Sequence, residues 1–198
     1  PELTCAVGAL LSYLIETQKQ NLSHLTQFNI YEIGSLMALD KATIRNLEIT
    51  ETLYDKKVQG SLLGVLDKTH TAMGGRKIKQ WLREPLNKVG EINMRLDAVE
   101  ELVNDVIMRN NIKEALKRIY DIERLAGRIA CGNANGKDMV ALRNSVFVVP
   151  DIKSELAGCE SALLSDMGLE LSDLSDIYNL VDAAIVDEPP FTIKEGGL

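Results

Sequence analysis

Residues 88–104, KVGEINMRLDAVEELVN, are the stretch of sequence that decides the fold. Apolar side chains recur there every three or four residues, a spacing that places them along one side of an α-helix. They are Val89, Ile92, Leu96, Val99, Leu102 and Val103. The stretch therefore predicts one amphipathic helix.

The same spacing continues on both sides, and residues whose side chains cap helices mark where new helices start. These expected start residues are Asp40, Ser61, Thr71, Asp121, Asn135 and Ser172. We expect helices at 3–19, 40–47, 61–66, 71–84, 88–104, 107–119, 121–132, 135–149, 151–157, 160–167 and 172–185. Pro85 and Pro150 stop the helices before them, as does Gly168. Asn110-Asn111 allows a break within the helix at 107–119.

Two short segments indicate something other than helix. Leu36–Leu39 is read as either a strand or a buried turn, and Phe191 and Ile193 alternate with polar neighbours as a short exposed strand does. The sequence thus predicts an all-α fold, an irregular multi-helix core with at most one or two very short strands. We expect a single domain over 1–198, in which 1–34 is an entering helix with its connection and 186–198 is an exit segment.

The composition is that of an ordinary globular protein, large enough to fold without disulfides or metal. Aromatic residues make up only 5% of the 198 residues, which favours packed helices over a β-sandwich. The net charge of −7 argues against a main surface that grips a DNA backbone. Cys5, Cys131 and Cys159 are widely spaced, so we expect reduced, buried thiols in a cytoplasmic protein. The longest apolar run, 5–15, is too short to cross a membrane.

The chain carries no recognisable catalytic, cofactor or metal motif. His24 and His70 each lack a second ligand at metal-binding spacing. Gly74-Gly75 is not part of a GxxxxGK[ST] phosphate loop, so we interpret the pair as a place where another backbone approaches closely. We therefore expect no catalytic, cofactor-binding or metal-binding residue, no small-molecule substrate and no enzyme activity in this chain.

Basic residues gather in two places. They are Arg76, Lys77, Lys79 and Arg83 in one cluster, and Arg124 with Arg128 on one helix face. Glu84, Asp121 and Glu123 offer partners, which favours a solvated or internally paired face. A contact with DNA phosphate stays an open alternative. Trp81 lies on an apolar stripe, which predicts a core anchor.

Several short motifs follow one another in a fixed order. The first is Leu10, Leu11, Tyr13, Leu14, Thr17 and Gln18; the second is Asp40, Thr43, Arg45, Asn46, Leu47, Glu48, Ile49 and Thr50. The third is Met73, Gly74, Arg76, Ile78, Lys79, Trp81, Leu82 and Pro85; the fourth is Asp121, Glu123, Arg124, Leu125 and Arg128. The last is Ile185, Asp187, Pro189, Pro190, Ile193, Gly196 and Gly197. This ordered series resembles the core, or lever, domain of the MutS family of DNA mismatch repair proteins.

The resemblance implies a role in a longer protein. In this family the helical core links a mismatch-reading domain and a DNA-embracing clamp to a distant ATPase domain. The resemblance implies that 1–34 enters from a connector domain and that 186–198 leads toward the clamp. For the longer protein it implies ATP and Mg as cofactors, with mismatched double-stranded DNA, a second MutS subunit and a MutL-type protein as partners. Since Pro1 is not an initiator Met, we expect a fragment.

The leading hypothesis is a non-catalytic segment that couples the ATPase domain to mismatch-DNA binding. A free-standing α-helical adaptor would explain the helical pattern and the acidity, but not the ordered motifs. A helical-bundle enzyme is the third alternative, and the absence of clustered histidines argues against it. Within the family, a relative that acts in recombination is a further alternative.

Overall fold

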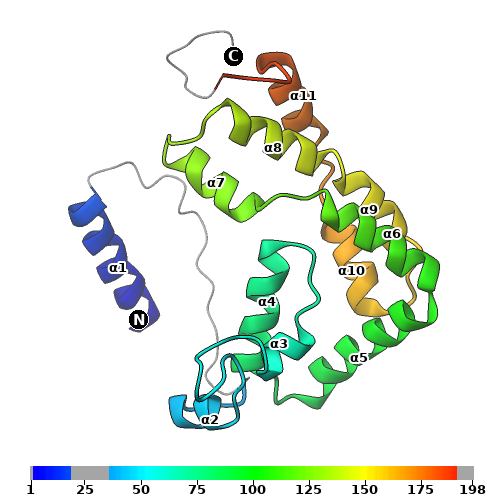
Figure 1. Ribbon diagram of the computed structural model, residues 1–198. Helices are drawn as coiled ribbons and strands as arrows, with labels where there is room; N and C mark the ends of the chain where they lie inside the picture. Colours follow the sequence, from blue (N-terminus) through cyan, green and yellow to red (C-terminus); the bar gives the residue numbers. More distant parts are fainter. Residues whose placement is uncertain (1, 19–35, 191–198) are drawn as a thin grey trace. The chain divides into compact units, whose positions relative to one another are not determined.

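The structure, a computed structural model, describes residues 2–18 and 36–190. Every regular element within these residues is an α-helix, which confirms the predicted all-α fold (Figure 1). The helices are α1 (Glu2–Gln18), α2 (Lys41–Asn46), α3 (Leu62–Leu66), α4 (Ala72–Arg83), α5 (Val89–Asn104), α6 (Val106–Lys117), α7 (Ile122–Ala130), α8 (Gly136–Val146), α9 (Val149–Leu156), α10 (Ala162–Glu170) and α11 (Ser175–Ala184). Leu36 forms an isolated antiparallel bridge with Leu86. The strand predicted at Phe191 and Ile193 lies outside the described residues.

The chain divides into two units, residues 1–32 and residues 33–198. The first unit contains α1, on which Leu10, Tyr13 and Ile15 are exposed. Near the end of α1, the Thr17 hydroxyl donates to the carbonyl oxygen of Tyr13 at 2.8 Å. The single domain expected over 1–198, with its segments 1–34 and 186–198, stays a prediction.

Side-chain caps start five of the ten described helices of the second unit at the predicted positions. The backbone N–H groups of a first helical turn lack partners within the helix, and a capping oxygen satisfies one of them. The observed caps are Asp40 for α2, Ser61 for α3, Thr71 for α4, Asp121 for α7 and Asn135 for α8. The starts of these five helices are therefore encoded by local sequence.

The break allowed at Asn110-Asn111 is wrong. Both residues lie inside α6, and the chain instead turns at Asp105, between α5 and α6. The carboxylate of Asp105 accepts from the Met108 N–H at 2.9 Å, so it caps α6 immediately after α5 has ended.

The expected stop at Pro150 is also wrong. α8 ends at Val146, and Pro150 lies in the first turn of α9, where a missing N–H leaves no helical bond unmade. Between the two helices Val148 is completely buried. The residue that was expected to end one helix therefore helps to start the next.

Two later boundaries differ as well. α10 continues through Gly168, where a Cβ would lie 3.0 Å from the Cβ of Leu156, so the glycine serves close helix packing rather than helix termination. Ser172 does not cap α11, which begins at Ser175. There the Asp173 carboxylate accepts from the Ser175 N–H at 3.1 Å.

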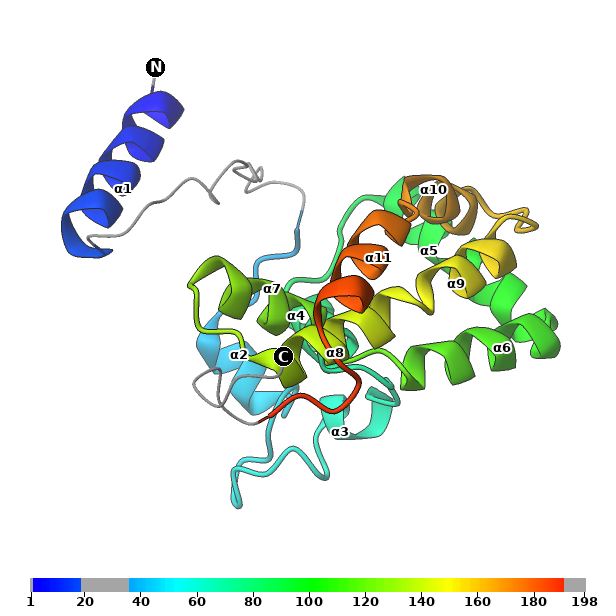
Figure 2. The same ribbon diagram turned by 90° about the horizontal axis from the view of Figure 1, so that it is seen from above.

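Helices α3 to α11 of the second unit pack in three groups (Figures 1 and 2). α3 packs on α4, while α5, α6, α9 and α10 form a second group and α7, α8 and α11 form a third. The second group closes over a core of Ala98, Leu156 and Leu164. Since α9 follows α8 directly, buried Val148 lies at the junction of the second and third groups.

The helix predicted at 88–104 is confirmed, but most of its apolar stripe faces solvent. Val89, Leu96, Val99 and Val103 are 69%, 57%, 55% and 58% exposed. Ala98, from another side of α5, is the residue that enters the core. Of the predicted stripe, Leu102 packs against this core, whereas these four residues do not contribute to it.

A substitution at Gly64 tests how tightly the turn before α3 is packed. A Cβ at this position would lie 2.2 Å from the carbonyl oxygen of Val58. We expect Gly64→Ala to lower the free energy of unfolding by about 1–3 kcal/mol, since backbone has to move to relieve the clash. Gly90→Ala is the matched control, because no atom lies within 4 Å of its added Cβ. Urea unfolding measures both, and equal midpoints for the two variants would contradict this packing.

Candidate functional site

The described residues offer no arrangement for metal chemistry. Within 2–18 and 36–190, no group of three or more His, Cys, Asp or Glu side chains could hold a metal ion. His70 is exposed, and His24 lies outside the described residues. In the same part of the chain, no helix has the length and apolarity needed to span a bilayer.

Three arginines each join helices through bonds to carboxylates. The first is Arg76 on α4, which reaches the start of α7. Its Nη1 and Nη2 atoms donate to the two carboxylate oxygens of Asp121 at 2.8 and 2.7 Å, and its Nε donates to Glu123 at 3.1 Å. A planar guanidinium matches a carboxylate in this two-bond geometry, which fixes direction as well as distance.

Asp121 has a second role at the same place. Its carboxylate also accepts from the backbone N–H of Arg124 at 3.3 Å and so caps α7. The hydrogen bonds from Arg76, helped by the N–H of Arg124, lower the pKa of Asp121 to about 2. The carboxylate is therefore ionised well below neutral pH and holds two helices at once.

Arg128 makes the second connection, from α7 to α8. Its guanidinium lies 2.9 Å from the Asp138 carboxylate and donates to the carbonyl oxygen of Asn133 at 3.1 Å. Asp138 is also one half of a capping box, because it accepts from the Asn135 N–H while the Asn135 side chain accepts from the Asp138 N–H. As at Asp121, a carboxylate that caps one helix also binds an arginine from an earlier helix.

Arg143 makes the third connection, from α8 to α11 and the segment that follows it. The residue is only 9% exposed, yet its two terminal nitrogens lie 3.0 Å from Asp182 and 2.7 Å from Asp187. Hydrogen bonding to Asp187 and the charge of Asp182 raise the pKa of Arg143. A buried guanidinium needs such partners, because an unpaired charge away from water is costly.

We call Arg76, Arg128 and Arg143 with their carboxylate partners the arginine series. It runs from α4 to α7, from α7 to α8, and from α8 to α11 and Asp187 (Figures 1 and 2). Among the basic residues singled out in the sequence, Arg76 is paired with Asp121 and Glu123, as predicted, and Arg128 is paired with Asp138. Glu84 instead accepts from Gln80 at 3.1 Å.

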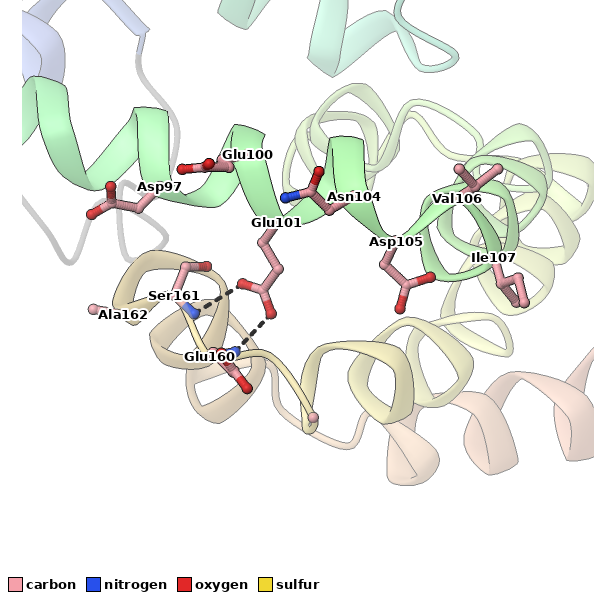
Figure 3. A pocket seen from close by; sticks show the side chains of 11 residues that line it. Asp97, Glu100, Glu101, Asn104, Asp105, Val106, Ile107, Glu160, Ser161 and Ala162 are labelled. Atoms are coloured by element: carbon pink, nitrogen blue, oxygen red, sulfur yellow. Dashed lines mark hydrogen bonds between the residues drawn. The ribbon is translucent and has the colours of Figure 1, made fainter.

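A hollow of about 1050 Å³ lies between α5, the start of α6 and the start of α10 (Figure 3). Acidic residues line it, among them Asp97, Glu100 and Glu101. The Glu101 carboxylate accepts from the backbone N–H groups of Glu160 and Ser161 at 2.7 and 2.9 Å. The Ser161 side chain, followed by the N–H groups of Glu160 and Ser161, lowers the pKa of Glu101. The two backbone bonds tie α5 to the start of α10, so this carboxylate is engaged in holding the fold.

Three further predictions about side chains are wrong. Trp81 is 39% exposed and stacks under the guanidinium of Arg95 at 3.9 Å, so it is a surface contact between α4 and α5 rather than a core anchor. Cys5 and Cys131 are exposed rather than buried, and Cys159 is half-buried.

The close approach expected at Gly74-Gly75 involves side chains instead of a second backbone. A Cβ on Gly74 would lie 3.0 Å from the Thr71 hydroxyl and 3.1 Å from the Cβ of Thr69. The Gly74 N–H donates to the same Thr71 hydroxyl at 3.0 Å. The glycine therefore makes room for the cap of its own helix.

Comparison with known proteins assigns this chain to a family. Residues 42–198 match the sequence model of MutS domain III. The chain belongs to the MutS domain III family. The match covers α2 to α11 and thus all three helical groups of the second unit.

Curated relatives agree with this assignment. The chain is 51% identical over 193 residues to the DNA mismatch repair protein MutS of Ruminiclostridium cellulolyticum, and 49% identical over 193 residues to that of Alkaliphilus oremlandii; each alignment covers 98% of this chain and 22% of the relative. It is 47% identical to MutS of Clostridium kluyveri over 198 residues, which is 100% of this chain and 23% of the relative. This MutS domain III chain therefore spans less than a quarter of the length of these relatives.

Asp121→Asn tests the first connection of the arginine series. Asn caps a helix about as well as Asp, so this change removes the charge and keeps the cap of α7. Because the folded pKa of about 2 lies below the ordinary value of 3.8, the charge stabilises the fold above pH 3.8 and loses this effect as pH falls toward 2. We expect the wild-type chain to have the higher thermal midpoint at pH 5 to 7, and the difference to shrink between pH 4 and 2.

Thermal unfolding across this pH range measures the effect, with Asp166→Asn, an exposed carboxylate of α10, as the control. A difference between wild type and Asp121→Asn that stays constant down to pH 2 would show that the charge is not what stabilises this joint.

Proposed function

We propose that this chain is the non-catalytic core, or lever, segment of a DNA mismatch repair protein, in which it couples an ATPase domain to the binding of mismatched DNA. Membership of the MutS domain III family and the similarity to DNA mismatch repair proteins support this proposal. The observation that carries the coupling role is the arginine series, because it joins α4, α7, α8 and α11 by directional bonds.

The physical argument concerns stiffness along a path of helices. Packed helices move as rigid bodies, and a displacement at one end is transmitted when the joints between them resist bending. Each joint of the series contains a guanidinium bound to carboxylates on another element, and Arg143 reaches Asp187 beyond the last described helix. The segment would thus carry a change in position from one working domain to another.

The proposal also covers the cofactors and partners of the longer protein. ATP with Mg is hydrolysed in a domain outside this chain, and mismatched double-stranded DNA, a second MutS subunit and a MutL-type protein are the partners. In this proposal the protein acts in the cytoplasm. A free-standing helical adaptor does not account for the match over 42–198.

The isolated chain should perform no reaction and read no mismatch. We expect the purified 198-residue chain to hydrolyse no ATP and to bind matched and mismatched duplexes equally, because it contributes the coupling element alone. A phosphate-release assay and fluorescence anisotropy measure the two properties, with the longer protein as positive control. Turnover that follows the pure chain through purification would refute the proposal.

The coupling itself is tested in the longer protein with Asp187→Asn. Asp187 is 86% exposed on its side chain, so its loss removes one bond to Arg143 while the neighbouring Asp182 still pairs with the arginine. We expect the variant to keep both its rate of ATP hydrolysis and its affinity for mismatched DNA. The factor by which ATP changes the affinity for DNA should fall by about three- to tenfold.

Asp151→Asn is the matched control, because Asp151 is similarly exposed and faces Arg118 outside the series at 3.8 Å. An unchanged effect of ATP on DNA affinity in Asp187→Asn would contradict the coupling role, and equal losses in both variants would contradict the importance of the series.

A further inference from the structure

Arg118, at the end of α6, is an arginine with unused hydrogen-bond donors. Among the described residues its guanidinium donates no hydrogen bond, and the nearest carboxylate oxygen, on Asp151, lies 3.8 Å away. Arg76, in contrast, donates to Asp121 at 2.7 Å. The Arg118 side chain is also more than half exposed. Because a guanidinium carries five N–H donors in a flat fork, the binding capacity of Arg118 is open to a ligand.

Two surface hollows share Arg118 as a wall. One, of about 290 Å³, is lined by Arg118, Tyr120, Asn144 and Phe147. The other, of about 380 Å³, lies between α6 and α9, two helices that pack on each other (Figure 1). We call the two hollows together the Arg118 groove.

The first hollow presents aromatic rings that the fold holds in place. Tyr120 and Phe147 are each more than half exposed. The Phe147 ring packs on that of Tyr178 with 5.5 Å between centroids, and the Tyr120 N–H donates to the hydroxyl of completely buried Ser145 at 3.0 Å. The exposed Asn144 amide has no hydrogen-bond partner in the described part of the chain. Exposed aromatic residues beside an arginine are the composition of a binding hot spot.

The second hollow is acidic. Glu114, Asp151 and Glu155 line it. Glu114 is paired with Lys117 at 2.6 Å, whereas the Glu155 carboxylate accepts from the neutral amide of Asn111 at 2.9 Å. Glu155 therefore has no cation within ion-pair distance among residues 2–18 and 36–190. A positively charged group is the complement of this hollow.

We propose that the Arg118 groove binds an extended segment of a partner protein that carries a basic, an acidic and an aromatic side chain at alternate positions. The carboxylate of the segment binds Arg118, its aromatic ring packs on Phe147, and its cation lies beside Glu155. Alternate residues of an extended chain point to the same side, so one short segment reaches both hollows. Charge complementarity puts the acidic residue in the middle. The proposal does not depend on the coupling role.

Amide NMR spectra of the full 198-residue chain test the groove. The probes are a terminally blocked Lys-Ser-Glu-Ser-Phe peptide and its reversal, Phe-Ser-Glu-Ser-Lys. Since three side chains on an open surface bind weakly, we expect at least one probe to bind with a dissociation constant on the order of 0.1–1 mM and to shift the amides of Arg118, Asn144 and Phe147.

A peptide of the same composition, Glu-Ser-Lys-Ser-Phe, is the control for the order of charges. It should bind at least about tenfold more weakly, because its cation then faces Arg118. Absence of saturable shifts with both probes at about 10 mM, or equal binding of all three peptides, would overturn the proposal.

Arg118→Gln tests the central contact. We expect it to raise the dissociation constant of the peptide at least about tenfold, because the carboxylate loses a charged, two-bond partner. Arg83→Gln is the matched control, since Arg83 is an exposed arginine of α4 outside the groove. The same spectra show whether each variant is folded. Unchanged affinity in Arg118→Gln, or an equal loss in both variants, would overturn the proposal.

A charge exchange tests the acidic hollow. Glu155→Lys should weaken binding of the better probe about tenfold, because two cations then face each other. Replacing the Lys of that peptide by Glu should restore its affinity for Glu155→Lys. A variant that binds both peptides equally would contradict the placement of the cation and overturn the proposed order of side chains.

An unpaired nucleotide is the other ligand that an aromatic ring beside an arginine can take, by stacking its base and binding its phosphate. The three carboxylates of the second hollow repel a phosphate, which favours the peptide. Adenosine monophosphate should therefore leave the amides of the groove unshifted up to about 10 mM. Saturable binding of this nucleotide, tighter than that of the peptides, would assign the groove to nucleotides and overturn the proposal.

Discussion

An arginine bound to a carboxylate that already starts another helix is the interaction on which the arrangement of this chain depends. Asp121 caps α7 and receives Arg76 from α4; Asp138 belongs to the capping box of α8 and receives Arg128 from α7. In both cases one carboxylate fixes where a helix begins and where its neighbour lies. A shift of the helix that carries the arginine therefore acts on the first turn of the next helix.

The Arg76 joint matters because it connects α4 of the first helical group to α7 of the third. The second group has its own core of Ala98, Leu156 and Leu164, and Val148 anchors its junction with the third. α4, in contrast, meets α7 through Arg76 and α5 through the stacking of Trp81 on Arg95, and both arginine contacts are directional. Dispersion and burial hold each group together, whereas hydrogen-bond geometry sets the angle between groups.

Local chemistry explains how much of this fold is predictable from sequence. Caps such as Ser61 and Thr71 act within three residues, so their signal is complete in a short window. The sequence predicts helix ends at Pro150 and Gly168, and both predictions are wrong. A proline can end one helix or lie in the first turn of the next, and a glycine can end a helix or allow close packing. Only the neighbouring helix decides between these two roles. The stripe of α5 predicts a helix, but periodicity does not tell which surface meets that side.

The site was less predictable than the fold. The partners Arg76 and Asp121 are 45 residues apart, and Arg143 and Asp187 are 44 apart. Acidic residues were available to every arginine in the sequence, so pairing in general was predictable and the particular pairs were not. The double role of Asp121 had a usable signal, since the sequence predicts it both as a helix cap and as a partner for the basic cluster that includes Arg76.

Native-state hydrogen exchange on the Asp121→Asn chain tests most directly whether the joints act together. If the series transmits strain, breaking the bond to Arg76 lowers the protection of backbone amides in α4 and α7 and also in α8 and α11, which do not touch the substituted residue's partner. Loss of protection confined to α4 and the first turn of α7 would contradict the account, because the joint would then be a local contact and not part of a connected path.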